Sequence, residues 1–186
     1  MVSLALMIRA GWACTALFVD YGQKARDIER NAFESICEHL RVPKIYREVS
    51  LWDVKGNLLL GDIGGTPMLQ HRNLVLLVAA DIEAHARNAD AIVTGFCLSP
   101  LYPDSSRPFC QLAQHLLQQS GRNNRIILAP LLDLTKVEIG RLGRELSLPL
   151  DLATSCYCPS DSAPCQVCEG CKDRVTAMEA WHASGA

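Results

Sequence analysis

Short apolar runs alternate with amphipathic segments along most of the chain, and this order restricts the fold more than any other feature. The run at 15–20 (TALFVD) is almost continuously apolar, which is typical of a strand buried on both faces of a parallel sheet. The next segment, 25–41, has its apolar residues on one side of a helix and ends at Val42-Pro43. Such alternation predicts an α/β domain with a doubly wound, mostly parallel sheet. Helices are expected at 2–9, 25–41, 72–87, 111–119, 136–146 and 172–182, strands at 15–20, 44–49, 91–94 and 125–128, and loops at 57–67 and 98–108.

The N-terminus departs from the usual pattern of this fold class. A doubly wound sheet normally starts with a central strand and a phosphate-binding turn, whereas this sequence starts with a predicted helix. We therefore expect the sheet to lack the usual first strand. We predict an α/β nucleotide-binding domain over 1–150, and a cysteine-rich knob with a terminal helix packed on that domain over 151–186.

The cysteines are unevenly distributed. Five of the nine lie between residues 156 and 171. An odd total without a secretion signal argues against a disulfide framework, and favours a metal site in the reducing cytoplasm. We therefore expect a cytoplasmic protein.

The spacing within the cluster indicates the ligands. Cys165-x2-Cys168-x2-Cys171 supplies three thiolates, and Cys156 is placed to supply the fourth of a closed, structural Zn²⁺ site. An iron–sulfur cluster is the strongest alternative, because ferredoxins also use C-x2-C-x2-C, but no C-x3-C-P continuation follows here. Cys158 is able to replace Cys156, although a C-x-C pair rarely gives two ligands to one tetrahedral ion. We expect Cys158 to be a spare thiol.

Composition excludes several classes of function. Hydrophobic residues make up 49% and charged residues 20%, so the chain is able to bury a core. Lysine and arginine number 18 against 20 acidic residues, for a net charge of −2, which disfavours a protein that binds nucleic acid through phosphate contacts. No apolar run approaches the ~20 residues of a membrane span, so no membrane partner is expected.

Several motifs follow one another in an order that a known family shares. They are F-V-D-Y-G-Q at 18–23, Arg72-Asn73 opening a helix, Thr94-Gly95, Y-P-D at 102–104, P-L-L-D-L-T-K at 130–136, and the four-cysteine knob. In these motifs the chain resembles the 7-cyano-7-deazaguanine synthase (QueC/ExsB) family of queuosine biosynthesis, within the PP-loop ATP pyrophosphatase superfamily. The resemblance covers nearly the whole chain, and D-Y-G-Q and the cysteine spacing are its most specific parts.

The resemblance implies a fold and a reaction. The fold is an adenine nucleotide hydrolase-like, Rossmann-like α/β sheet with a structural zinc. Members of the family tend to dimerise, so a homodimer is expected. The family adenylates the carboxylate of 7-carboxy-7-deazaguanine with ATP and Mg²⁺, and ammonia then displaces AMP. The amide is activated again and dehydrated to the nitrile. The partners implied are therefore small molecules: a deazaguanine carboxylate, ATP and ammonia.

The resemblance also implies roles for individual residues. Lys136 and Arg72 would be catalytic, with Lys136 reaching a phosphate or pyrophosphate. Both lie at predicted helix starts, where a cation opposes the helix dipole, so helix stability does not explain them and an anion-binding role is favoured. Tyr102 and Asp104 would bind the substrate. The residues carried over to the nucleotide are Ser3, Tyr21, Gly22, Gln23, Asn73 and Gly95.

Two departures from the family pattern lead to a second interpretation of the function of this chain. The family opens with a strand and an S-G-G-x-D-S loop, of which Met1-Val2-Ser3 matches only the last three positions, with Val2 in place of aspartate. The segment 98–101 also lacks the family's acidic residues, which bears on the substrate. We expect that the chain as written is a truncated version that does not hydrolyse ATP by itself. The alternative is a catalytically inactive, zinc-stabilised paralogue that binds a nucleotide or a partner.

Overall fold

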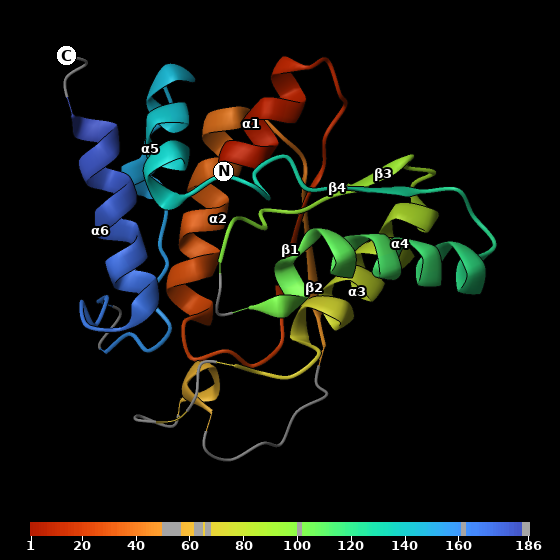
Figure 1. The fold of residues 1–186 in the computed structure, drawn as a ribbon, viewed down its shortest axis with the longest axis horizontal. Coiled ribbons are helices and arrows are strands. Elements are labelled where there is room, and N and C mark those ends of the chain that lie inside the picture. The colour runs from red at the N-terminus through yellow and green to blue at the C-terminus, as the bar shows by residue number, and fades with distance from the viewer. Residues whose placement is uncertain (50–56, 62–64, 66–67, 100–101, 161–162, 184–186) are drawn as a thin grey trace. The chain divides into compact units, whose positions relative to one another are not determined.

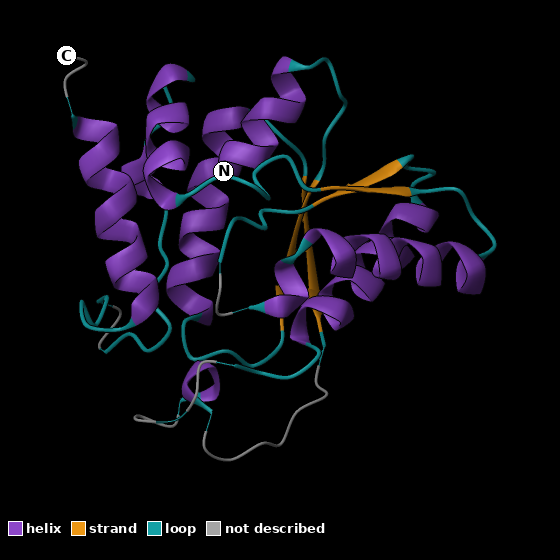
Figure 2. Cartoon of the chain, in the orientation of Figure 1, coloured by secondary structure: helices purple, strands orange, loops and turns teal. Residues whose placement is uncertain are grey.

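The computed structural model describes residues 1–49, 57–61, 65, 68–99, 102–160 and 163–183. The chain divides into two compact units. Unit 1 combines Met1–Leu69 with Lys136–Ala186, and unit 2 is Gln70–Thr135. Figures 1 and 2 show the helices and strands of each unit. The domain boundary at residue 150 that the sequence suggests stays a prediction.

Unit 1 contains one pair of parallel strands. Strand β1 pairs with β2 in a register that runs from Ala16 opposite Lys44 to Asp20 opposite Glu48, and the Val49 N–H continues the ladder to the Asp20 carbonyl at 2.7 Å. The elements of this unit are α1 (Val2–Arg9), β1 (Ala16–Asp20), α2 (Arg26–Leu40), β2 (Lys44–Glu48), the 3-10 turns η1 (Leu58–Leu60) and η3 (Leu150–Leu152), α5 (Lys136–Glu145) and α6 (Glu169–His182).

Aromatic rings join α2 to this strand pair. The ring of Phe33 on α2 lies 5.5 Å from that of Phe18 on β1 and 5.4 Å from that of Tyr46 on β2, measured between centroids. The Tyr46 hydroxyl also donates to the Glu34 carboxylate at 3.1 Å. Aromatic packing and this hydrogen bond thus hold α2 against the strand pair.

The two C-terminal helices of unit 1, α5 and α6, run side by side (Figure 1). Their close approach depends on Gly140, since a Cβ there would collide with the Ala177 carbonyl oxygen and meet the Ala180 Cβ at 3.0 Å. Gly143 similarly leaves room for the side chain of Leu150. Because α6 also begins at the cysteine cluster, this packing attaches the cluster to the rest of unit 1.

Unit 2 contains the second pair of parallel strands and two helices that pack on it (Figures 1 and 2). Its core contains Leu77 and Ala84 of α3, Ile92 of β3, and Ala113 and Leu117 of α4. Its elements are α3 (Arg72–Ala86), β3 (Ala91–Val93), the 3-10 turn η2 (Pro103–Ser105), α4 (Arg107–Gly121) and β4 (Ile126–Leu128).

These observations confirm an α/β protein with parallel strands. The described strands form two parallel pairs, one in each unit, so a single doubly wound sheet stays a prediction. The residues at 62–64, 66–67 and 100–101, which the sequence assigns to loops, lie outside the described part of the chain.

Two helices begin earlier than the sequence predicts. The loop expected at 98–108 ends early, because α4 starts at Arg107 with Ser106 as its cap, whose Oγ accepts from the Phe109 N–H at 3.4 Å. Helix α6 starts at Glu169, because Cys168 takes the N-cap position. Both starts depend on cap residues that an apolar pattern does not mark.

Candidate functional site

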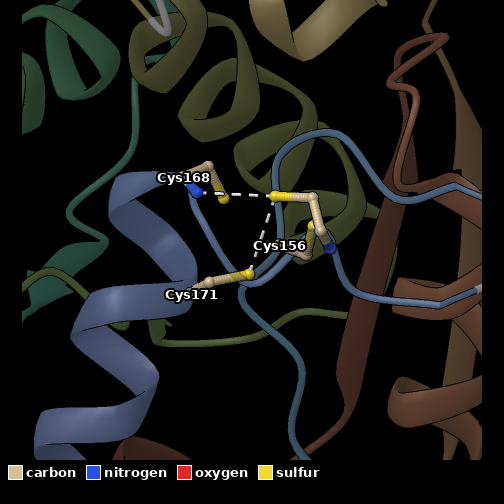
Figure 3. Close-up of side chains that lie close together, drawn as sticks. Cys156, Cys168 and Cys171 are labelled. Atoms are coloured by element: carbon tan, nitrogen blue, oxygen red, sulfur yellow. Dashed lines mark hydrogen bonds between the residues drawn. The ribbon is translucent and has the colours of Figure 1, made fainter.

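Four cysteines of unit 1 form a cluster at the start of α6. The Sγ atoms of Cys156, Cys165, Cys168 and Cys171 all lie within 4.8 Å of one another. In Figure 3 the side chains of Cys156, Cys168 and Cys171 turn toward a common centre, with Cys168 and Cys171 at the beginning of the helix. These four residues are the ones that the sequence spacing selects.

Backbone N–H groups point at three of the sulfur atoms. Cys165 N donates to the Sγ of Cys156 at 3.2 Å, Tyr157 N to that of Cys168 at 3.4 Å, and Cys168 N to that of Cys165 at 3.4 Å. Such donors stabilise negatively charged thiolates. The turn packs so closely that a Cβ on Gly170 would collide with the Ser155 carbonyl.

The pKa values of the ligating thiols fall on both sides of the ordinary value. Burial raises the pKa of Cys156 and, together with neighbouring thiols, that of Cys171. Burial also acts on Cys165, but hydrogen bonds from the backbone of Val167 and Cys168 outweigh it and lower the Cys165 pKa to about 6. The Cys165 thiolate is thus available near neutral pH, and a bound cation would favour ionisation of Cys156 and Cys171.

The geometry of the cluster fits one tetrahedral metal ion. Zinc–sulfur bonds of ~2.3 Å in a tetrahedron place the sulfurs about 3.8 Å apart. The Sγ atoms of Cys165 and Cys171 are 3.9 Å apart. An iron–sulfur cluster would hold its thiolates around several atoms and therefore farther apart. The residues therefore fit a closed zinc site, in which the metal would hold the loop against α6.

Cys158 lies beside this site rather than in it. Its thiol donates to the Cys165 Sγ at 3.5 Å, but it is not among the four clustered sulfurs. Burial and the neighbouring sulfurs raise the pKa of Cys158 to about 12. Its position outside the four clustered sulfurs, and not its pKa, agrees with the expectation of a spare cysteine.

The D-Y-G-Q segment forms a turn at the carboxyl end of β1. Gly22 has a φ of +82°, which glycine adopts readily, and its N–H donates to the Asp20 carboxylate at 2.9 Å. The buried Gln23 amide accepts from Tyr21 N at 2.9 Å and donates to Glu29 at 3.0 Å. Gln23 therefore fastens the turn to α2, and a direct nucleotide contact by its side chain stays a prediction.

Hydrogen bonds connect predicted catalytic, nucleotide-binding and substrate-binding residues of unit 2, namely Arg72, Asn73 and Asp104. The Oδ1 of Asn73 accepts from the Nε and Nη2 of Arg72, both at 3.3 Å, at the start of α3. The Nδ2 of Asn73 donates to the Asp104 carbonyl at 3.1 Å, within the turn that Tyr102 precedes. Asn73 thus connects the start of α3, where Arg72 lies, to the turn that contains Asp104.

Three other predicted residues have separate surroundings. Lys136 is the first residue of α5, and its Nζ lies 3.3 Å from the Asp173 carboxylate of α6. Ser3 is buried in the first turn of α1. Gly95 is exposed just after β3. Their proposed roles stay predictions.

Sequence reasoning missed Glu29 and Asp173, the acidic partners of Gln23 and Lys136. Neither residue is marked by a motif. Asp173 lies far from Lys136 in the sequence and meets it only because α5 packs on α6. Only the packed structure identifies such partners.

Residues 1–182 match the family model described as "Queuosine biosynthesis protein QueC". The chain belongs to the QueC family. Among its relatives is a "7-cyano-7-deazaguanine synthase" of Campylobacter jejuni, 32% identical over 92% of this chain and 84% of the relative. A synthase with the same description from Methanothermobacter thermautotrophicus is 30% identical over 96% of the chain and 88% of its own length.

A longer QueC-family relative also matches. The "7-cyano-7-deazaguanine synthase 2" of Sulfurisphaera tokodaii is 31% identical over 95% of this chain, which corresponds to 42% of that protein. The match of residues 1–182 to the QueC family model confirms the family resemblance deduced from the motifs. It assigns the chain to queuosine biosynthesis and to a family of enzymes. Within the described residues, every helix is too short or too polar to cross a membrane.

Proposed function

We propose that this chain is an ATP-dependent, AMP-forming ligase that converts the carboxylate of 7-carboxy-7-deazaguanine to an amide and then to a nitrile. The match of residues 1–182 to the QueC family is the observation that carries this proposal. The synthase names of its relatives support the nitrile 7-cyano-7-deazaguanine as the product.

The reaction proceeds through two activations. The substrate carboxylate attacks the α-phosphate of ATP, which forms an acyl adenylate and releases pyrophosphate. Ammonia attacks the acyl carbon, and AMP leaves to give the amide. The amide oxygen then attacks the α-phosphate of a second ATP and releases pyrophosphate, and loss of AMP and of the two amide protons gives the nitrile. Mg²⁺ accompanies ATP and offsets the charge of its phosphates.

The residues of the chain supply charge and orientation. The Arg72 guanidinium, held by Asn73, is suited to pair with the substrate carboxylate or the phosphate that it attacks. Tyr102 and Asp104 offer polar groups to the deazaguanine. Lys136 would balance the charge of pyrophosphate by exchanging its Asp173 partner for the anion. The zinc would act only structurally, because its four thiolates leave no open position.

An assay with matched omissions tests the proposal. The chain, and a form that carries any residues encoded upstream of Met1, are incubated with ATP, Mg²⁺, ammonium and 7-carboxy-7-deazaguanine. We expect pyrophosphate and AMP to form only when the acid is present. We expect mass spectrometry to find the amide after the first activation and the nitrile after the second. A folded, metal-loaded protein that is inert in both forms would instead be the non-catalytic paralogue.

A further inference from the structure

A buried asparagine connects α3 to the turn before α4. Asn73 is only 4% exposed. Its Nδ2 donates to the Asp104 carbonyl at 3.1 Å, and its Oδ1 accepts from two nitrogens of Arg72 at 3.3 Å. Both ends of the amide are therefore engaged by the protein, and almost no surface of this side chain remains for a nucleotide or a substrate.

The bonds from Arg72 restrict the movement of its guanidinium. Arg72 is half-buried, and the two bonds to one oxygen use its Nε and Nη2. A guanidinium has five N–H donors, so this arrangement leaves donors for a ligand. Because the side chain is already oriented, it loses less conformational entropy when it pairs with an anion.

The turn on the other side of Asn73 is closed by its own hydrogen bonds. The N–H and the Oγ of Ser105 both donate to the Tyr102 carbonyl, at 3.0 and 2.8 Å. Such a turn holds its own shape but needs an attachment to hold its position. The bond from Asn73 to the Asp104 carbonyl links it to α3, across 31 residues of sequence.

We propose that Asn73 is a positioning residue that couples the Arg72 guanidinium to the turn bearing Tyr102 and Asp104. The amide fixes the cation relative to the groups expected to recognise the base, so that the carboxylate of a bound substrate meets Arg72 in one orientation. This assignment rests on the proposed function and replaces the nucleotide contact expected for Asn73 with a role exerted through Arg72 and the turn.

A double-mutant cycle in the full chain, in its active form, tests the coupling. We expect Asn73→Ala to lower kcat/KM for the carboxylate by about tenfold to a hundredfold, and to leave the KM for ATP nearly unchanged. In the Arg72→Ala background the same substitution should have much less effect. Effects that multiply fully would contradict the proposal, since Asn73 would then act independently of Arg72.

Asn73→Asp separates the two ends of the amide. The carboxylate keeps an acceptor for Arg72 but has no N–H to donate to the Asp104 carbonyl. We expect a loss smaller than that of Asn73→Ala, with partial rescue of kcat. Asn31→Ala, which removes an exposed asparagine from α2, is the matched control and should behave as the parent chain. Parental activity of Asn73→Asp would contradict the proposed coupling, because this variant has lost the bond to the turn.

Hydrogen exchange gives a readout that does not depend on activity, so failure of the proposed function and failure of this inference are distinguishable. The amides of residues 102 and 104–106 should exchange faster in Asn73→Ala and Asn73→Asp than in the parent chain, but not in Arg72→Ala, which keeps the bond to Asp104. Unchanged exchange of these amides in both Asn73 variants would overturn the inference, whatever the catalytic assay shows.

Discussion

At the scale of single residues, Lys136 is a cation whose ion pair contributes little to the stability of the fold. It opens α5, where the helix dipole disfavours a positive charge. Its partner Asp173 is 3.3 Å away, but the two side chains are 34% and 36% exposed. A pair this exposed contributes only about 0–1 kcal/mol to stability. The proposed role in binding an anion would account for a lysine at this position.

Replacing Lys136 therefore separates binding from stability. We expect Lys136→Ala to weaken ATP binding by about tenfold to a hundredfold, from the loss of a charge-assisted contact, with a nearly unchanged melting temperature. Isothermal titration calorimetry and thermal denaturation measure the two effects. Lys44→Ala is the control, because Lys44 makes a similar exposed pair with Glu38 at 3.2 Å. If Lys136→Ala lowers the melting temperature and keeps ATP affinity, the lysine is structural.

Cys158 and Cys168 offer a second comparison between single residues. We expect Cys168→Ser to abolish zinc binding and to lower the melting temperature strongly, because structural zinc contributes about 10–16 kcal/mol in small peptides. Cys158→Ser should retain about one zinc per chain, since this thiol lies outside the four-sulfur cluster. Metal analysis and calorimetry of both variants check this. Equal losses would mean that Cys158 is a ligand, and visible absorbance would indicate an iron–sulfur cluster.

At the scale of elements, the apolar pattern predicts where helices and strands lie, but not where they end or what they contact. The run at 15–20 is strand β1, and the segment at 25–41 is helix α2, because their apolar residues face a common partner. The start of α4 is capped by the Ser106 side chain, and α6 begins after Cys168, two positions that an apolar pattern does not mark. The cluster of Cys156, Cys165, Cys168 and Cys171 was predictable because these cysteines are closely spaced in the sequence.

The contact between α5 and α6 is an element-scale feature that a single methyl group tests. Gly140→Ala places a Cβ against the Ala177 carbonyl, so the helices must separate or shift. We expect a loss of about 1–3 kcal/mol in the free energy of unfolding, measured by denaturant titration. Arg141→Ala, at an exposed position of the same helix, should cost much less. A neutral Gly140→Ala would show that the two helices are not closely packed in solution.

At the scale of the whole molecule, the residues proposed for catalysis belong to both units. Lys136 and the turn after β1 belong to unit 1, whereas Arg72, Tyr102 and Asp104 belong to unit 2. The order of these motifs along the sequence identified the QueC family, and the match over residues 1–182 confirms that assignment. The local geometry of each group was not predictable, because Asn73 and Gln23 show their internal hydrogen bonds only in the folded chain.

The ratio of AMP formed to nitrile formed tests the central claim most directly. Two activations by ATP, one of the acid and one of the amide, predict two AMP and two pyrophosphate for each nitrile. A reaction that starts from the amide should form only one AMP and one pyrophosphate for each nitrile. Quantitative chromatography of nucleotides and deazaguanines in the same reaction gives these ratios. Formation of ADP in place of AMP, or of nitrile without AMP, would contradict the proposed reaction.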